Sequence, residues 1–186
     1  MTSNRLALFV PFALAVLGIA SCTGNNTANK TEAEVYLSQS ISKGPADVDI
    51  SVPADVTIAN MTINSHAKAT TTVLSQQDDA ILTDWVVTPS RSDGGTVASP
   101  VWHNYYQVYV PAGGSASLQN YRIFPAEYFQ QPPLSQLFSG PDKETGNCNI
   151  RQRLHIAIYG KTVAGKSISL EFDVNLNFYY LKPSCS

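Results

Sequence analysis

In ISLEFDVNLNFYYL, residues 168–181, apolar and polar side chains alternate, and this alternation is the clearest indication of the fold class. The apolar or aromatic residues at every second position are Ile168, Leu170, Phe172, Val174, Leu176, Phe178 and Tyr180. A period of two is typical of a strand with one buried side and one side in solvent. The stretch therefore predicts a long strand in a sheet that is covered on one face.

The segment just before it predicts a second strand. RLHIAIYGKT, residues 153–162, alternates in the same way, with Leu154, Ile156 and Ile158 on one side and His155 on the other. The link VAGK, residues 163–166, supplies the glycine that a tight turn favours. We expect these two segments to form an antiparallel hairpin with His155 exposed.

Shorter strands are expected at 48–52, 56–63, 81–87, 105–110 and 118–124, with glycine-bearing turns in the connecting segments. The apolar phase changes near Asn60, which predicts a β-bulge there. Beyond the first 22 residues no segment shows a sustained helical period. The pattern predicts an all-β domain, an immunoglobulin-like antiparallel β-sandwich of seven or eight strands, with a closed β-barrel as the alternative.

The N-terminus has the organisation of a secretory signal, with Arg5 before an apolar run over residues 6–20. This run is shorter than the roughly 20 residues that a membrane-spanning helix needs. Its last residues lead into the sequence IASC, residues 19–22, which resembles the bacterial lipobox. The resemblance implies a signal peptide over 1–21, cleavage before Cys22 and lipid on the Cys22 thiol. A soluble product cleaved after Ala20 and a permanent membrane anchor remain the alternatives.

Residues 22–34 are polar, and they predict a flexible tether between the lipid and a domain over residues 35–186. Thr23 stands where an aspartate would favour retention in the inner membrane of enteric bacteria. The lipobox resemblance therefore implies a lipid-anchored protein of the bacterial cell envelope, at the outer membrane. The expected partners are this membrane, through the lipid, and an envelope protein.

The chain contains three cysteines: Cys22, Cys148 and Cys185. If Cys22 carries lipid, an even pair is left, and an exported protein can join such a pair in a disulfide. A Cys148–Cys185 bridge would stabilise the fold by roughly 3–4 kcal/mol. Two reduced thiols are the alternative. No further ligand lies at the spacing of a zinc site, so we expect no metal and no cofactor.

The sequence offers little for catalysis or for nucleic-acid binding. The net charge of −2 does not favour contact with a polyanion. His66, His103 and His155 lie far apart in sequence, and there is no G-x-S-x-G motif. The acidic residues at 47, 49, 78 and 79 do not follow a calcium-loop pattern and are expected to be solvated. We therefore expect a protein that is not an enzyme.

Two aromatic or apolar segments are the candidate contact sites. The first is VWHNYYQVY, residues 101–109; if Tyr106 points inward on a strand, Tyr105, Gln107 and Tyr109 point outward, near Trp102. The second is EYFQQPPLSQLF, residues 127–138. Its side chains either cover a sheet edge or form an exposed docking patch. The candidate contact residues of that patch are Phe129, Leu134 and Leu137.

Four segments in this order resemble a class of bacterial lipoproteins with one immunoglobulin-like β-sandwich: SRSDGGT, VYVPAGGSASL, QPPLSQL and LHIAIYGKTVAGKSISLEFDV. The similarity covers residues 58–180 and implies a fold and a location but no catalytic residue. Two functions fit: a lipid-anchored envelope module that binds protein or assists assembly, and a module that binds carbohydrate or another surface ligand. An exposed apolar patch at Phe129 would favour protein, and exposed aromatic rings beside a shallow groove would favour sugar.

Overall fold

The computed structural model describes residues 31–41 and 46–181. Its strands are β1 (Val35–Ile41), β2 (Asp47–Asp49), β3 (Val56–Ala67), β4 (Ala80–Arg91), β5 (Trp102–Val110), β6 (Ser115–Phe124), β7 (Asn149–Thr162) and β8 (Ser167–Tyr179). Three short 3-10 helices accompany them: η2 (Gln76–Asp78), η3 (Ala126–Gln130) and η4 (Leu134–Phe138). The described part of the chain is thus an all-β domain with eight strands.

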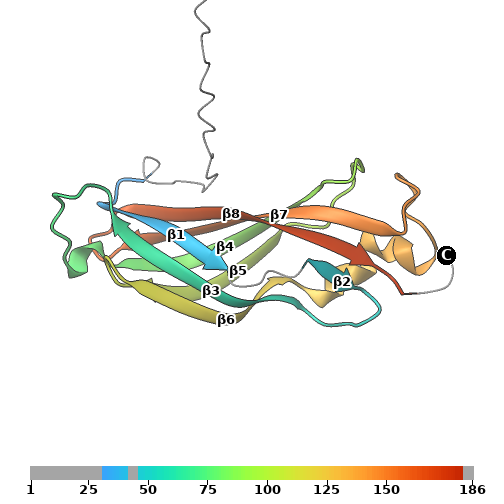
Figure 1. Cartoon of the computed structure of the whole chain (residues 1–186), viewed down its shortest axis with the longest axis horizontal. Helices are drawn as coiled ribbons and strands as arrows, with labels where there is room; N and C mark the ends of the chain where they lie inside the picture. Colours follow the sequence, from blue (N-terminus) through green and yellow to red (C-terminus); the bar gives the residue numbers. More distant parts are fainter. Residues whose placement is uncertain (1–30, 42–45, 182–186) are drawn as a thin grey trace, which may run out of the picture.

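The strands form two packed sheets, one with the order β1-β3-β6 and the other with the order β2-β8-β7-β4-β5 (Figure 1). In immunoglobulin domains, strands A, B and E are neighbours in one sheet and C, F and G in the other. Here β1, β3 and β6 correspond to strands A, B and E, and β4, β7 and β8 correspond to strands C, F and G. The predicted immunoglobulin-like β-sandwich is confirmed, and no pairing among the described strands closes it into a barrel.

The chain contributes to both sheets near its start. β1 pairs with β3 in the smaller sheet, whereas β2 pairs with β8 in the larger one. The β2–β8 pairing is parallel, which corrects the expectation of purely antiparallel sheets. β2 is also shorter than the strand expected over 48–52.

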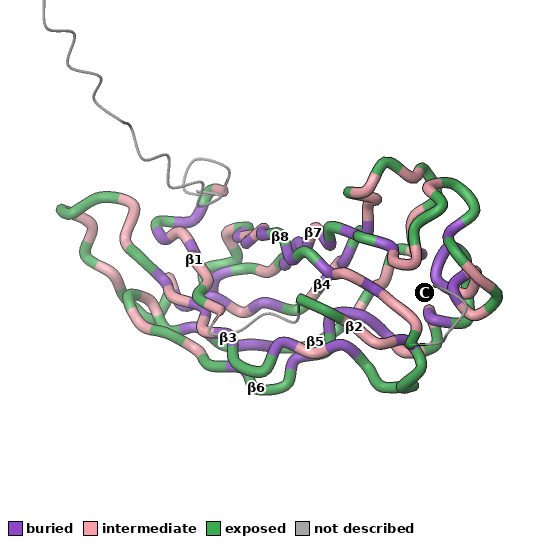
Figure 2. The backbone as a smooth tube through the Cα atoms, turned by 45° about the vertical axis from the view of Figure 1, so that its right-hand side comes forward, coloured by how far each residue is buried: buried purple, intermediate pink, exposed green. Residues whose placement is uncertain are grey.

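The predicted C-terminal hairpin is confirmed as β7 and β8, which pair from Asn149 with Tyr179 to Lys161 with Ser167. Along most of both strands, buried residues alternate with exposed or half-buried ones; Ala157 is an exception, since it is buried between two buried neighbours (Figure 2). Gly165 makes the turn with a φ of 83°, a conformation that glycine adopts without steric strain.

The change of apolar phase in β3 has a different origin from the expected bulge at Asn60. Ala59 and Asn60 are both exposed, and so are Gln119 and Asn120 on the neighbouring β6. Each strand has one extra exposed residue at this level, so the residues before and after it are paired in the same register. The register shift lies instead between Val56 and Thr57. Asn120 absorbs the irregularity with a φ of 50°. The prediction of a bulge at Asn60 was therefore wrong.

The core contains a tryptophan at the place where immunoglobulin domains bury one on strand C. Trp85 on β4 is fully buried, its ring centroid lies 4.3 Å from that of Tyr121, and its Nε1 donates a 2.8 Å hydrogen bond to the Tyr106 carbonyl. Burial raises the pKa of Tyr121 to about 12. The Tyr106 ring also packs against Tyr121, with 5.8 Å between centroids, so Tyr106 points inward as expected but stays partly exposed.

The connection between β6 and β7 is part of the core. Phe129, Leu134 and Leu137 are only 1%, 0% and 2% exposed. The Phe129 ring lies 6.0 Å from Phe124 and 6.2 Å from Phe178, between centroids. Of the two alternatives for this segment, the exposed docking patch is contradicted, because the two 3-10 helices turn these side chains into the end of the sandwich.

Several expectations concern residues outside the described part. Cys22, with the signal peptide before it, and Cys185 lie there, so lipidation and the Cys148–Cys185 bridge remain predictions. Ala33, within the expected tether, is buried in the core, so packed structure begins before Val35. Over residues 31–41 and 46–181, no helix has the length and apolar character to span a membrane.

Candidate functional site

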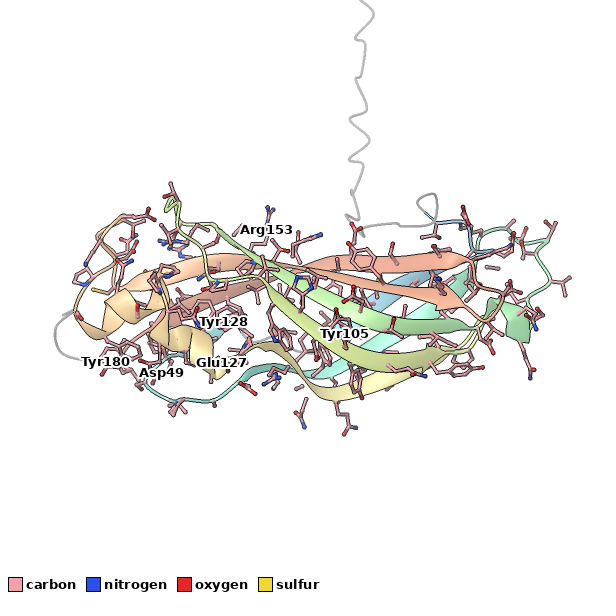
Figure 3. All side chains as sticks on the ribbon, turned by 180° about the vertical axis from the view of Figure 1, so that it is seen from behind. Asp49, Tyr105, Glu127, Tyr128, Arg153 and Tyr180 are labelled. Atoms are coloured by element: carbon pink, nitrogen blue, oxygen red, sulfur yellow. The ribbon has the colours of Figure 1, made fainter. Side chains whose placement is uncertain are left out.

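Exposed tyrosines gather on the outer face of the larger sheet. Tyr105 and Tyr109 on β5 are 81% and 51% exposed, and Tyr159 on β7 is 44% exposed. Tyr105 lies about midway along this side of the molecule in Figure 3. We call the surface formed by these three tyrosines with Thr83 and Asp84 of β4 the tyrosine face.

An irregularity in β4 shapes this face. On the β7 side, Leu82 pairs with Gly160 and Asp84 pairs with Tyr159, so Thr83 between them has no partner. An extra residue of this kind is a β-bulge, which bends the strand and redirects side chains. Thr83 is exposed as a result, and Leu82 keeps its place in the core.

β5 adapts to the bulge with an extra residue of its own. Leu82 pairs with Val108 and Asp84 with Tyr105, which leaves Tyr106 and Gln107 opposite a single residue of β4. The irregular pairing falls on the free edge of the sheet, since β5 pairs only with β4. A bulged edge is a poor template for the addition of another strand.

Gly160 permits the close approach of β7 to β4. A Cβ atom there would lie 2.1 Å from the Ile81 carbonyl oxygen and 2.7 Å from the Leu82 Cα. A hollow of about 370 Å³ lies over this contact. Its lining is Ile81, Thr83, Tyr159, Gly160, Lys161 and Thr162. The glycine and the bulge together give an otherwise pleated face a depression beside Tyr159.

Asp84 lies between two of the tyrosines. It pairs across the strands with Tyr105 on one side and Tyr159 on the other, and its neighbour Trp85 points into the core. Residues directly opposite on neighbouring strands share a face, with Cβ atoms about 4.5–5.5 Å apart. The Asp84 Oδ1 is buried and has no hydrogen-bond partner. This carboxylate is the one charged group that the tyrosine face leaves unsatisfied among the residues described.

Tyr109 is held in place by Asp79, a buried residue directly before β4. Its hydroxyl donates a hydrogen bond to Asp79 Oδ2, and the Ala112 N–H donates one of 2.7 Å to Oδ1. The bond from Tyr109, followed by that from Ala112, lowers the pKa of Asp79. The same bond raises the pKa of Tyr109. The ring of Tyr109 is therefore a fixed part of the face.

Of the four contact residues predicted on β5, three are exposed and one is half-buried. Tyr105, Gln107 and Tyr109 are exposed together on the outer side of β5, as expected. Trp102 is half-buried, with the Arg122 guanidinium 5.1 Å from its ring centroid. Such a cation–π contact occupies one face of the indole, so Trp102 offers less for stacking than the sequence indicates.

Two residues of the face were missed from the sequence. Tyr159 alternates with Ile158 in the predicted hairpin, and that alternation already places it on the solvent side. Asp84 interrupts the apolar segment ILTDWVV, residues 81–87, and a charged residue within a predicted strand indicates its outward face. Their proximity depends on which strands are neighbours, which the sequence pattern does not give.

A second polar cluster joins two loops. Arg91 at the end of β4 donates hydrogen bonds of 2.7 and 3.0 Å to Asp93 and of 2.8 Å to Asp142, and all three side chains are at most 5% exposed. Burial opposes the charge on Asp142, but the hydrogen bonds from Arg91 and Thr145, with the positive charge of Arg91, together outweigh it and lower the pKa of Asp142. Glu144 accepts hydrogen bonds from Thr96, one of them 2.7 Å from the backbone N–H. The cluster ties the two loops together.

Two of the three histidines contact a single polar neighbour each. His155 Nδ1 lies 2.9 Å from Asp173 Oδ1 and His66 Nε2 lies 2.8 Å from Ser38 Oγ, both on exposed sheet surfaces. Neither pair lines the hollow beside Tyr159. His103 is exposed on β5. Within residues 31–41 and 46–181, no three histidine, cysteine or acidic side chains are grouped so that they could hold a metal ion.

The acidic residues near β2 have local partners. Asp47, Asp49 and Asp55 line a hollow of about 320 Å³. Asp47 accepts a 2.8 Å hydrogen bond from the Asn177 side chain, and Asp55 accepts one of 3.2 Å from Arg122. Asp49 bonds to a backbone N–H two residues on. These contacts stabilise the β2 region.

No known protein family and no curated protein sequence matches the chain significantly.

Proposed function

We propose that the chain is a non-enzymatic, lipid-anchored domain of the bacterial cell envelope that binds a partner protein through its tyrosine face. The observation that supports this proposal is the placement of Tyr105 and Tyr159, exposed on either side of Asp84. Tyrosine is enriched where proteins bind one another, because its ring supplies a large contact area and its hydroxyl a hydrogen bond. The resemblance of residues 19–22 to the bacterial lipobox supports the anchor and the envelope location.

The face has the properties of a prepared contact surface. The bulge at Thr83 and the close approach at Gly160 fix its shape, and Asp79 holds Tyr109. A side chain that is already ordered loses less conformational entropy when a partner binds. The protein-binding proposal thus moves from the connection between β6 and β7, whose apolar side chains are buried, to the larger sheet.

A second candidate function is carbohydrate binding, and both features that distinguish the two functions favour it: Phe129 is buried, and exposed tyrosines lie beside a hollow. Protein binding is placed first because of the carboxylate of Asp84 between Tyr105 and Tyr159, which has no partner among the described residues. A sugar ring in this hollow would stack on the tyrosine and reach the Thr83 hydroxyl and the Lys161 ammonium group. In that case a glycan array is expected to show binding that is lost when Tyr159 is changed to Ala and kept when Gln119, on the opposite sheet, is changed to Ala.

Site-specific photocrosslinking in native membranes tests the protein-binding proposal. A photoreactive amino acid replaces Tyr105, and in a matched control it replaces Gln119, which is exposed on β6 of the other sheet. We expect a discrete adduct from position 105 that is absent from position 119 and is lost when Tyr159 is also changed to Ala. Identical adducts from both positions, or none from position 105, would overturn the proposal.

A further inference from the structure

The carboxylate of Asp84 accepts no hydrogen bond from the described residues. Its Oδ1 is buried without a partner, and no hydrogen bond or ion pair to either of its oxygens is formed among the residues described. A buried carboxylate oxygen without a donor costs free energy relative to the same group in water. Because Oδ1 has almost no accessible surface, a donor from outside would reach the carboxylate through Oδ2, to which no described residue donates a hydrogen bond, and would offset the cost of the uncompensated charge.

The surroundings of Asp84 favour a cation. Tyr105 and Tyr159 are its direct cross-strand neighbours, and the faces of aromatic rings attract positive charge. Lys161 projects from the same face of β7, two residues beyond Tyr159, and pairs in register with Ile81 on the far side of the bulge. Within the described chain Lys161 forms no ion pair, so the charge on Asp84 stays uncompensated.

The geometry points to Asp84, Tyr105 and Tyr159 as a receptor for an arginine side chain of the partner protein. This inference rests on the proposed protein-binding function and names the chemistry of the partner. A guanidinium group is planar, so it can stack on a tyrosine ring while one of its N–H groups donates to the accessible carboxylate oxygen. It is also more weakly hydrated than the lysine ammonium group, which reduces the cost of placing it between two rings.

The hollow beside Tyr159 adjoins the proposed receptor and could hold the residues next to the arginine. It begins at Tyr159 and extends over Gly160 toward Lys161 and Thr162. A partner segment with its arginine at Asp84 would therefore lay its neighbouring residues in this depression. Lys161 at the far end would repel a second basic residue there, so the chemistry fits a single arginine within an otherwise uncharged segment.

A binding experiment with a minimal probe tests the inference. Nα-acetyl-arginine amide is titrated into the ¹⁵N-labelled full chain in detergent micelles, and Nα-acetyl-citrulline amide, which has the same shape without the charge, is the matched probe. We expect the arginine compound to shift the amide signals of residues 83–85, 104–106 and 158–160. The citrulline compound and the variant Asp84→Asn are each expected to bind at least tenfold more weakly.

Two further variants keep the result interpretable. Asp173→Asn removes a carboxylate of the same sheet that already contacts His155, and it is expected to leave arginine binding unchanged. Tyr105→Ala removes a side chain that is 81% exposed, so the fold is expected to survive while binding weakens several-fold. Equal binding of the two probes, or arginine binding unaffected by Asp84→Asn, would overturn the inference.

The outcomes separate this inference from the proposed function. If the arginine compound does not bind but photocrosslinking at position 105 still gives its specific adduct, the arginine receptor is wrong and the protein-binding face stands. If the crosslink also fails, both are wrong.

Discussion

Gly160 lies so close to the backbone of Ile81 that a Cβ atom on residue 160 would come within 2.1 Å of the Ile81 carbonyl oxygen. The neighbouring atom is backbone near the start of β4, where the strand is paired on both sides, so it has little freedom to move aside. At this point Thr83 of β4 has no pairing partner on β7 and forms a bulge. The contact therefore determines both the pairing of the two strands and the hollow of the tyrosine face.

The variant Gly160→Ala is expected to lower the free energy of unfolding by about 1–3 kcal/mol, because overpacking forces the two backbones apart. Urea unfolding followed by circular dichroism measures this change. Ser167→Ala, at an exposed position on β8, is the matched control and is expected to change stability by less than about 0.5 kcal/mol. Equal stability of the two variants would contradict the close approach.

Replacement of Arg91 by Met is expected to destabilise the domain by about 3–5 kcal/mol. The methionine keeps much of the buried volume, but it leaves the carboxylates of Asp93 and Asp142 buried without their cation. Thermal unfolding measures the loss. Arg153→Met removes an exposed arginine from β7 and is expected to have an effect within about 0.5 kcal/mol. Similar losses in both variants would mean that the buried cluster has no special role.

The hydrogen bond from Tyr109 to Asp79 predicts a pH-dependent contribution to stability. The pKa of Asp79 is lowered in the folded state, so the stabilisation is complete above the unfolded pKa of about 3.9 and is lost as the pH falls through the folded value. Tyr109→Phe is expected to raise the pKa of Asp79 and to lower stability at pH 7. The difference from the unmodified protein then narrows as the pH falls below about 4.

Unfolding in urea at several pH values, together with a carboxyl ¹³C titration of Asp79, checks this expectation. Tyr105→Phe is the matched control, since the Tyr105 ring is largely exposed and its hydroxyl bonds to no described residue. A constant difference between Tyr109→Phe and the unmodified protein from pH 7 to pH 3 would count against the role of this bond.

The hairpin of β7 and β8 was predictable because its pattern is local: alternation fixes the faces of each strand, and the glycine at 165 marks the turn. The same alternation placed Tyr105 and Tyr109 outward correctly. The site itself was only half predictable. Asp84 and Tyr159 come together with Tyr105 through the order β5-β4-β7, and strand order follows from the packing of the whole sandwich.

The connection between β6 and β7 shows a second limit. Its apolar residues carry no strand or helix period, so the sequence is compatible with either an exposed patch or a buried plug. In the structure the segment is buried, because the 3-10 helices η3 and η4 turn Phe129, Leu134 and Leu137 inward. The phase change at Asn60 was misread for a related reason, because the compensating irregularity lies at Asn120 on another strand.

The buried position of Phe129 predicts that Phe129→Ala destabilises the domain by about 3–5 kcal/mol, since it leaves a cavity against Phe124 and Phe178. Glu127→Ala, at an exposed position two residues earlier, is the control and is expected to have little effect. Chemical denaturation of both variants decides the question. If Phe129→Ala were as stable as Glu127→Ala, the connection would not belong to the core.

The three cysteines predict a distinct intact mass for the protein purified from native membranes. Lipidation of the Cys22 thiol is expected to be followed by cleavage before Cys22, so that residues 1–21 are lost and the remaining chain carries three acyl chains. The two other cysteines, Cys148 and Cys185, are then expected to resist alkylation until a reductant is added, because an exported pair can close a disulfide. The measurement is intact-mass spectrometry with and without reductant before alkylation.

Cys22→Ser is the matched variant for the anchor, and it is expected to abolish the acyl mass and to leave the protein uncleaved before residue 22. Cys148→Ser is expected to leave Cys185 open to alkylation without reductant and to lower stability by roughly 3–4 kcal/mol. A mass that begins at Ser21 without lipid would instead make this a free exported domain. In that case the tyrosine face would meet soluble partners, because nothing would then hold it at the membrane surface.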